Sequence, residues 1–301
     1  MVQILPDNVN PELLVAFGDT ALRKGDPILA ERFYRAAISE AGGGAGPALH
    51  ARLGLTRKPN SRTLPMLDAL EAVQRIDARN SFVGEGLATW YKTPPFADDA
   101  RFLDLADRHA NLLPAANWHW NLQTVVWAVR QARPLPGDFV ELGVFKGHTT
   151  RFVADYLGFR DWPKTWFLYD TFEGIPQDQM NAGWAANNAR AYVGTFSFGE
   201  VRDRFADMAN IRVVKGRVPE VLAETCPEQI SFLHMDLNSA VAEVQALDIL
   251  FDRITPGGVI VFDDYAWTVS AQQRAAEDAW FARRGLHILP LPTGQGLFIK
   301  G

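Results

Sequence analysis

Cysteine is almost missing from this sequence, and its scarcity excludes two ways of holding a protein together. Cys226 is the only cysteine among 301 residues, so no disulfide can form within the chain. A structural zinc site built on thiolates is excluded for the same reason. Because disulfides belong to oxidising compartments, we expect a cytoplasmic protein.

Long apolar runs and clusters of positive charge are missing as well. No stretch approaches the roughly 20 apolar residues that span a bilayer, and the segment Met1 to Asn10 lacks the basic and apolar parts of a signal peptide. The net charge is −5 without any Lys/Arg block, which argues against nucleic acid or a polybasic membrane surface as the main partner. The sequence therefore predicts a soluble, unprocessed protein that acts on a small neutral or polar molecule.

Apolar residues make up 48% of the chain, enough for at least one full core, and the length suggests two structural units. From Pro11 to about Leu55 these residues recur at helical spacing and predict a helix pair. The pair resembles a tetratricopeptide unit at positions Gly18, Ala21, Gly25-Asp26, Ala30, Tyr34 and Ala37. Arrays of such units need about three copies, so we expect the pair to pack on the rest of the chain or to join subunits of a homo-oligomer. A peptide-binding module is the alternative.

Changes in composition divide the chain into three regions. We expect a helical tetratricopeptide-like region at 1–58, a helical connector or cover at 59–135, and a cofactor-binding domain at 136–301. The connector contains an amphipathic stretch from Leu64 to Ile76 and an aromatic-rich stretch from Trp118 to Val129. We place the tryptophans of the second stretch, Trp118, Trp120 and Trp127, on its core face.

Short apolar runs without polar alternation begin after Pro136-Gly137, as a parallel sheet covered on both faces requires. Helical stretches separate several of them, which predicts a doubly wound α/β domain that ends in an antiparallel hairpin around Pro292 to Gly296. The predicted strands are Asp138–Leu142, Thr165–Tyr169, Ile211–Val214, Ile230–Met235, Val259–Phe262, His287–Pro290 and Leu297–Lys300, and the main helices are Thr149–Leu157, Ala240–Arg253 and Ala271–Arg283. Ligands of such sheets bind beyond the carboxyl ends of the strands.

Glycines and an aspartate follow the first three predicted strands. Gly143 and the helix start after Gly147 offer a tight turn and free N–H groups, and Asp170 can accept from both hydroxyls of a ribose. Phe145 and Lys146 stand where a dinucleotide loop needs glycine, so a cofactor with one nucleoside and an amino-acid tail fits better. Plain turns are the structural alternatives for these positions. The cofactor candidates are Glu141, Gly143, Phe145, Asp170, Thr171, Phe172, Gly216 and Arg217.

Three carboxylates give the strongest signal. Asp236 ends the fourth strand, and Asp263-Asp264 ends the fifth. Neighbouring parallel strands lie about 4.8 Å apart, so these side chains can reach one point, where they would repel one another. A hard divalent cation such as Mg²⁺ prefers oxygen ligands and would remove that repulsion. A cap for the following helix and two surface residues are the alternative interpretation.

These motifs together resemble the macrocin O-methyltransferase family of metal-dependent methyltransferases that act on natural-product sugars. The resemblance covers roughly Pro136 to Lys300 and leaves out the helical N-terminal portion. It is carried by Gly137-Asp138-Phe139-Val140-Glu141-Leu142-Gly143-Val144, Asp170-Thr171-Phe172-Glu173-Gly174-Ile175-Pro176, Asp236-Leu237, Pro256-Gly257-Gly258, Asp263-Asp264-Tyr265 and Pro292-Thr293-Gly294-Gln295-Gly296.

The resemblance implies a class I methyltransferase sheet of seven strands that binds S-adenosylmethionine. It implies cofactor contact from Glu141, Gly143 and Asp170, and Mg²⁺ ligation by Asp236, Asp263 and Asp264. Such a metal would lower the pKa of a substrate hydroxyl and align its oxygen with the sulfonium methyl for a direct displacement.

Three residues are candidates for the general base. Asp236 is a candidate from the family pattern, but Leu237-Asn238-Ser239-Ala240 departs from the acidic or tyrosine-containing run of many relatives, and the lysine of catechol-type relatives is absent. His234 lies on the same strand face as Asp236 and is a second candidate, although a hydrogen-bonded core histidine is the alternative. His148 is a third.

A long polar insertion from Gln177 to Ser197 separates the second and third strands. With Trp184 and Tyr192 it has the length of a lid, and we expect it to shape the acceptor pocket together with Trp267 and the turn Thr293 to Gly296. A solvent-exposed excursion is the alternative.

The leading hypothesis is therefore methyl transfer to a hydroxyl of a sugar, glycan or related small natural product. A nucleotide-dependent oxidoreductase is the second, and the glycine loop disfavours it. A catalytically inactive protein-interaction module is the third.

Overall fold

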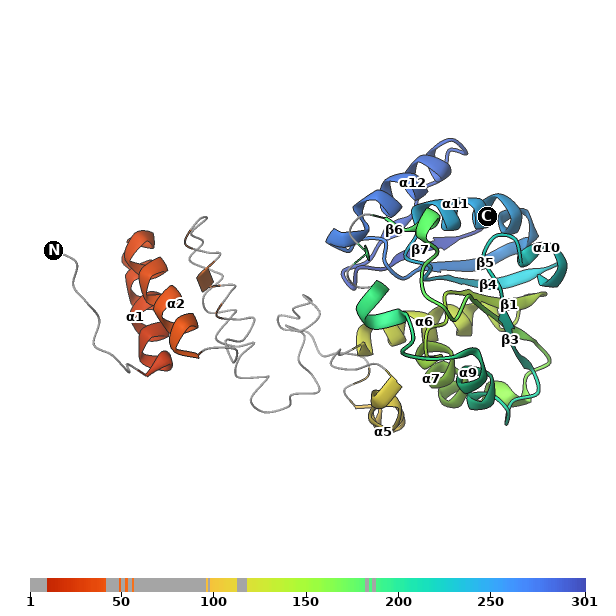
Figure 1. Ribbon diagram of the computed structural model, residues 1–301, viewed down its shortest axis with the longest axis horizontal. Helices are drawn as coiled ribbons and strands as arrows, with labels where there is room; N and C mark the ends of the chain where they lie inside the picture. Colours follow the sequence, from red (N-terminus) through yellow and green to blue (C-terminus); the bar gives the residue numbers. More distant parts are fainter. Residues whose placement is uncertain are drawn as a thin grey trace. The chain divides into compact units, whose positions relative to one another are not determined.

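The computed structural model describes residues 10–41, 98–112, 118–181 and 188–301, together with residues 49, 52, 53, 56, 96, 184 and 185. The chain divides into two compact units, Met1–Pro94 and Pro95–Gly301. Figure 1 shows both units and labels most of their helices and strands. The predicted amphipathic stretch at Leu64 to Ile76 lies outside the described residues.

The first unit contains the predicted helix pair, α1 (Pro11–Arg23) and α2 (Pro27–Ala41). The Asn10 side chain caps α1 by accepting from the Glu12 N–H at 2.8 Å. Gly18 lets the helices approach closely, because a Cβ there would lie 2.4 Å from the Tyr34 ring. Leu14, Ala21, Ala30, Tyr34 and Ala37 form the buried contact between the helices. Whether this unit joins subunits or binds a peptide stays a prediction.

The second unit is built on a seven-stranded sheet in the order β3-β2-β1-β4-β5-β7-β6. Its strands are β1 (Asp138–Leu142), β2 (Trp166–Asp170), β3 (Ile211–Lys215), β4 (Ile230–Met235), β5 (Ile254–Phe262), β6 (Leu289–Pro290) and β7 (Gly296–Ile299). The pairs among β1 to β5 are parallel, and β7 is antiparallel to β5 and β6. The predicted doubly wound, mostly parallel fold with a terminal hairpin is confirmed.

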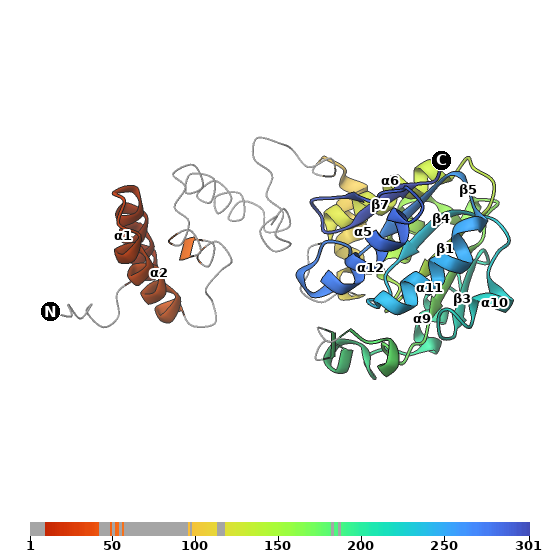
Figure 2. The same cartoon turned by 90° about the horizontal axis from the view of Figure 1, so that it is seen from above.

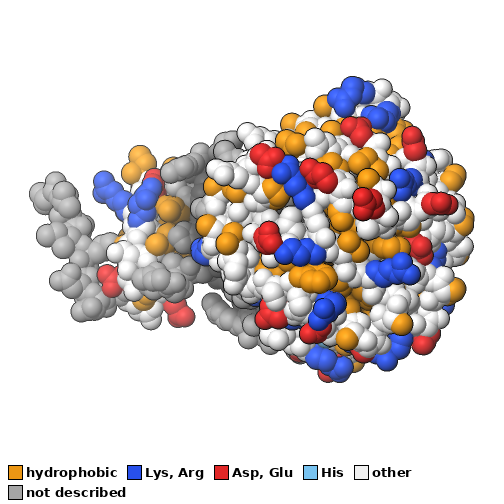
Figure 3. Space-filling view, turned by 45° about the vertical axis from the view of Figure 1, so that its right-hand side comes forward, with side chains coloured by type: hydrophobic (Ala, Val, Ile, Leu, Met, Phe, Trp, Pro, Cys, Tyr) orange, Lys and Arg blue, Asp and Glu red, His pale blue; other side chains and the backbone are white. Residues whose placement is uncertain are grey.

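Helices cover both faces of this sheet (Figures 1 and 2). One layer contains α5 (Ala100–His109), α6 (His119–Ala132), α7 (His148–Leu157) and α9 (Phe198–Arg204), and the other contains α10 (Leu222–Thr225), α11 (Ala240–Leu250) and α12 (Ala271–Ala282). Within the described residues, no helix has the length and apolar character needed to cross a membrane. Figure 3 shows acidic and basic side chains interspersed over the visible face of this unit, so that face carries no extended surface of one sign.

The strands are buried on both sides, as their unbroken apolar runs predict. Val140, Leu233 and Ile260 belong to the core on one side, and Phe139, Trp166 and Phe232 pack edge to face. Two sequence predictions were inaccurate here. Strand β5 begins at Ile254 rather than Val259, because the Thr255 to Gly258 segment continues the strand with an irregular register. Trp127 is 39% exposed, because α6 presents that position to solvent rather than to the core.

Strands β1 and β4 are neighbours at the centre of the sheet, where the order reverses. The Asp236 N–H donates to the Leu142 carbonyl at 2.8 Å, and the Asp263 N–H donates to the Met235 carbonyl at 2.9 Å. These bonds keep the carboxyl ends of β1, β4 and β5 level with one another. Residues that follow these strands are therefore held at one edge of the sheet, where ligands of such folds bind.

Candidate active site

A cavity of about 340 Å³ lies beyond the carboxyl ends of the central strands. It runs from the end of β2 past the glycine turn after β1 to the ends of β4 and β5. Its walls combine aromatic rings, backbone of the glycine turns and several carboxylates. The lining residues that bear on the argument are Trp118, Asn121, Glu141, Gly143, Phe145, His148, Asp170, Thr171, Trp184, Tyr192, Phe196, Gly216, Asp236, Asp263 and Asp264.

Gly143 lies where two backbone segments pass close to each other at this edge. Its φ is +84°, and a Cβ would lie 1.9 Å from the Asp236 carbonyl oxygen. Glycine is therefore needed because the backbone following β4 passes directly against the turn following β1. Gly147, with φ +75°, is the N-cap of helix α7, and no described side chain caps the first N–H groups of this helix.

Asp170 joins the end of β2 to the glycine turn. Its Oδ2 accepts from the Val144 and Phe145 N–H groups at 2.8 and 2.9 Å, and its Oδ1 accepts from the Phe172 N–H at 2.7 Å. Burial raises the pKa of this carboxyl, while the backbone donors oppose the rise. Asp170 thus shapes the glycine turn, and it still lines the cavity.

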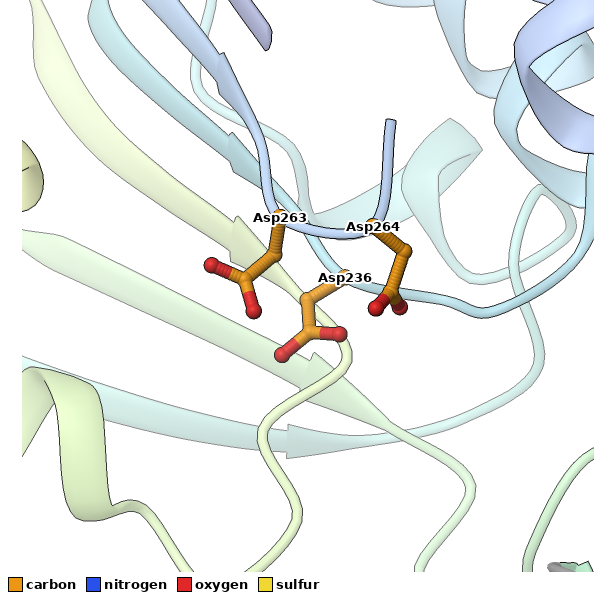
Figure 4. Close-up of side chains that lie close together, drawn as sticks. All are labelled: Asp236, Asp263 and Asp264. Carbon is orange, nitrogen blue, oxygen red and sulfur yellow. The ribbon is translucent and has the colours of Figure 1, made fainter. Parts of the chain in front are cut away.

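Asp236, Asp263 and Asp264 converge at the other end of the cavity (Figure 4). Each offers a carboxylate oxygen, and these oxygens all lie within 4.8 Å of one another. Asp264 is buried, and its Oδ2 has no hydrogen-bond partner among the described residues. Ser239, rather than Asp236, caps the following helix, since its side chain accepts from the Ala242 N–H. The geometry therefore leaves Asp236 available to a ligand.

Electrostatic repulsion within this trio is visible in the pKa values. Burial and the neighbouring carboxylates of Asp263 and Asp264 raise the pKa of Asp236 well above its usual range. Burial and Asp263 raise that of Asp264 in the same way. Carboxylates this close retain their charge only with a compensating cation, and an oxygen-only donor set suits a hard divalent one. The unpartnered oxygen of Asp264 fits such an ion.

A family model described as Macrocin-O-methyltransferase (TylF) matches residues 117–288, more than half of the chain. The chain belongs to the macrocin O-methyltransferase family. The matched segment contains the cavity-lining helix α6, the glycine turn and all three aspartates of the trio. The resemblance inferred from the motifs is thereby confirmed.

Two curated proteins align with this macrocin O-methyltransferase family member at moderate sequence identity. An 8-demethyl-8-(2,3-dimethoxy-alpha-L-rhamnosyl)-tetracenomycin-C 4'-O-methyltransferase of Streptomyces olivaceus is 27% identical over 155 residues, 48% of this chain and 59% of that protein. A demethyldecarbamoylnovobiocin O-methyltransferase of Streptomyces niveus is 25% identical over 198 residues, 59% of this chain and 75% of that protein. The chain thus spans about three fifths of the first relative's length.

Solved structures support the fold of the family member. The O-methyltransferase NovP superposes with a TM-score of 0.51 at 23% identity and covers 60% of this chain and 79% of its own. The calicheamicin methyltransferase CalS11 gives a TM-score of 0.51 at 18% identity and covers 70% of this chain and 95% of its own. At these identities the likeness extends to the fold alone.

His234 belongs to a buried network beside the trio. Its Nδ1 lies 3.1 Å from Glu141 Oε1 and its Nε2 lies 3.4 Å from Asp263 Oδ1, while Thr150 donates to the other oxygen of Glu141. Burial lowers the pKa of His234, but its hydrogen bonds to the carboxylates of Asp263 and Glu141 outweigh burial, so the pKa is raised well above the ordinary value. The fully buried ring is held between these two carboxylates and does not line the cavity, so it is poorly placed to act as a base.

His148, the other histidine considered as a base, is in the opposite state. It lines the cavity, and its Nδ1 has no hydrogen-bond partner among the described residues. Burial, and then the nearby His109 and His119, lower the pKa of His148 to about 4. His148 is thus neutral at physiological pH, and the same burial makes its ring a weak proton acceptor.

The remaining cofactor candidates separate into two groups. Gly216 and Thr171 line the cavity, and so does Phe145, whose ring packs edge to face against Tyr192 and Phe196. Phe172 and Arg217 are not among the described lining residues. The Phe172 ring packs on Phe198, and the Arg217 guanidinium pairs with Asp178 at 2.5 Å on the surface.

The predicted insertion places aromatic side chains over the cavity. Its described residues include two short helical turns, η5 (Gln177–Gln179) and η7 (Asn188–Tyr192). Trp184, Tyr192 and Phe196 line the cavity, which agrees with the expected covering position. Trp267 packs instead against Trp118, with ring centroids 6.0 Å apart.

Sequence reasoning missed an acidic pair behind the trio. Glu243 and Glu277 are fully buried on α11 and α12. Glu243 Oε1 accepts from the Leu237 N–H and from Gln273 Nε2, both at 3.0 Å. Burial and the nearby Glu277 carboxyl raise the pKa of Glu243 well above its usual range. The signal in the sequence is the polar spacing of Gln273 and Glu277 on an otherwise packed helix face.

Proposed function

We propose that this protein is an S-adenosylmethionine-dependent O-methyltransferase that requires Mg²⁺ and methylates a hydroxyl of a sugar-containing natural product or related small molecule. The observation that carries the proposal is the convergence of Asp236, Asp263 and Asp264 in the cavity that also contains the glycine turn after β1. Membership of the macrocin O-methyltransferase family and the printed activities of the relatives support it.

The methyl donor would occupy the part of the cavity between β2 and β1. The turn at Gly143, the carboxylate of Asp170 and the backbone at Gly216 would hold its nucleoside, and the first N–H groups of α7 would receive its carboxylate. Bound there, S-adenosylmethionine supplies an electrophilic methyl group. Phe145, fixed by Tyr192 and Phe196, would give that region an apolar wall.

The metal would be held by the aspartate trio. The donor set fits, because three mutually repelling carboxylates and one unpartnered buried oxygen require positive charge. A divalent cation there supplies the charge that lowers the pKa of an acceptor hydroxyl. His234 would hold Asp263 from the protein side, and Glu243 would hold the backbone at Leu237 next to Asp236.

Proton removal would fall to a group that faces the cavity. Asp236 is the leading candidate since it ends β4 beside the other two carboxylates and lines the cavity. His148 is the second candidate, because it lines the same cavity and its Nδ1 has no hydrogen-bond partner among the described residues. Trp184 and Tyr192 would exclude water from the reacting atoms. The direct displacement needs no covalent intermediate on the chain.

Calorimetry and turnover test this proposal. Adenosylhomocysteine should bind with measurable heat while NAD should not, and methylation of a panel of glycosylated acceptors, followed by mass spectrometry, should require Mg²⁺. Asp263→Ala should abolish metal binding and lower the rate by about 100-fold or more, since metal catalysis is worth several kcal/mol. Asp203→Asn, a surface carboxylate paired with Arg202, serves as the control. Full activity in both Asp263→Ala and Asp264→Ala would refute the metal mechanism.

A further inference from the structure

Gln295 is a buried amide that reaches the aspartate trio from the terminal hairpin. It lies in the turn between β6 and β7, and its side chain is fully buried. Its Nε2 donates to Asp263 Oδ1 at 2.8 Å and to the Asn121 carbonyl at 3.5 Å. A residue nearly at the end of the chain thus contacts a proposed metal ligand and the wall of the cavity at once.

The orientation of this amide is fixed on its other side. The Thr293 hydroxyl donates to Gln295 Oε1 at 3.0 Å and accepts from the Gln295 backbone N–H at 3.2 Å. Because a carboxylate can only accept, the NH₂ group must face Asp263 and the carbonyl oxygen must face the Thr293 hydroxyl. Neither a rotation nor a flip of the amide preserves these bonds.

The two glycines beside Gln295 allow the turn to approach this closely. Gly294 has φ +89°, and a Cβ there would lie 2.7 Å from the Trp267 ring. A Cβ at Gly296 would lie 2.7 Å from Ile288 and 2.8 Å from Tyr265. The close packing of the hairpin at these two glycines therefore fixes the position of the Gln295 amide.

The consequence for Asp263 is that its two oxygens are not equivalent. Oδ1 faces both Gln295 Nε2 at 2.8 Å and His234 Nε2 at 3.4 Å. Within the described part of the chain, no group donates a hydrogen bond to Oδ2. The carboxylate can therefore offer one oxygen to a cation while the other is engaged by the protein.

We propose that Gln295 is a positioning residue that makes Asp263 a one-oxygen ligand and thereby favours Mg²⁺ over Ca²⁺ in the trio. This inference rests on the proposed metal role of the trio. Mg²⁺ needs near-octahedral geometry with single carboxylate oxygens, whereas Ca²⁺ takes six to eight oxygens and readily binds both oxygens of one carboxylate. While Oδ1 is engaged by Gln295 and His234, Asp263 cannot bind a cation through both of its oxygens.

The test compares two cations in Gln295→Met, which keeps the side-chain volume and removes both amide groups. Mn²⁺, a spectroscopic substitute for Mg²⁺, is titrated by electron paramagnetic resonance, and Ca²⁺ is titrated by competition in the full-length protein. We expect Mn²⁺ affinity to fall by about 10-fold, as is usual when a partner of a metal ligand is removed. Ca²⁺ affinity should fall less, so the ratio of the two affinities should drop.

Two further variants keep the inference testable if Gln295→Met folds poorly. Thr293→Val removes the hydroxyl that orients the amide and should shift the ratio in the same direction by a smaller factor. Thr293→Ser retains the hydroxyl and should keep the wild-type ratio. Asn210→Leu is the matched control, because the Asn210 amide bonds three backbone carbonyls at the opposite edge of the sheet and should change stability without changing the ratio.

The outcomes separate the two proposals. Wild-type protein that binds no Mn²⁺ would overturn the metal site and this inference with it. Wild-type binding with an unchanged affinity ratio in Gln295→Met would overturn this inference alone. Equal losses for both cations, together with weaker adenosylhomocysteine binding, would also overturn it, because they would assign Gln295 a purely structural role in the hairpin.

Discussion

The two ends of the cavity are built on different principles. At the β2 end, Asp170 has three backbone N–H donors, so its charge is balanced by the chain itself. At the β4 and β5 end, Asp236, Asp263 and Asp264 repel one another, and Asp264 Oδ2 has no partner among the described residues. The first end is preformed, whereas the second needs positive charge from outside the chain.

The largest expected effect on this contrast comes from a substitution at Asp170. Asp170→Asn would leave one side-chain oxygen for three N–H donors and turn an NH₂ group toward the rest, so the glycine turn should loosen. We expect adenosylhomocysteine affinity to fall by about 10-fold or more and Mn²⁺ affinity to stay near wild type. Calorimetry and electron paramagnetic resonance measure the two quantities. Parallel losses of both would show that the two ends are not independent.

The pH dependence of metal binding tests the aspartate trio at the β4 and β5 end of the cavity. The pKa values of Asp236 and Asp264 are raised in the folded protein. Without metal, the trio is therefore best tolerated at low pH, where these carboxyls are protonated. The folded state loses stability as the pH rises above about 4, the ordinary pKa of aspartate, toward the raised pKa values of the two carboxyls. Mg²⁺ competes with protons for these oxygens. Adding Mg²⁺ should therefore raise Tm by about 5 °C at pH 8 and by much less at pH 5.5.

Differential scanning calorimetry at the two pH values checks this expectation. Asp263→Ala is the control and should show little Mg²⁺-dependent gain at either pH. An equal gain at both pH values in the wild type would indicate that the trio does not take up protons in place of the cation.

The smallest expected effect lies behind the trio, in the acid pair that sequence reasoning missed. Burial raises the pKa of both Glu243 and Glu277, so the pair destabilises the fold increasingly as pH rises. Glu277→Gln keeps a hydrogen-bonding group without the charge and should raise the free energy of unfolding at pH 8 by about 1 kcal/mol. Urea denaturation at pH 5.5 and pH 8 measures this change, and a loss of stability at pH 8 would contradict the expected repulsion within the pair.

Glu243→Gln is not an equivalent change. Glu243 Oε1 accepts from both the Leu237 N–H and Gln273 Nε2, so this side chain must remain an acceptor at that atom. Comparing the two variants separates the charge of the pair from its support of the backbone beside Asp236.

The sequence by itself determined the sheet, the order of its main elements and the place of the aspartate trio. Asp236 and Asp263 could be predicted to meet because both directly follow buried strands, and parallel strands end at the same edge. The helix pair at the N-terminus was equally predictable, since its apolar residues recur at helical spacing.

Only the tertiary structure decided which partners complete the site. His234 pairs with Glu141 because the register of β1 and β4 sets these two residues opposite each other, and Gln295 meets Asp263 because the hairpin folds back on β5. Gly143 was expected to serve a ligand, but its conformation is required by the Asp236 carbonyl. Local patterns fix periodicity and strand ends, whereas these contacts join segments far apart in the chain and depend on register and packing.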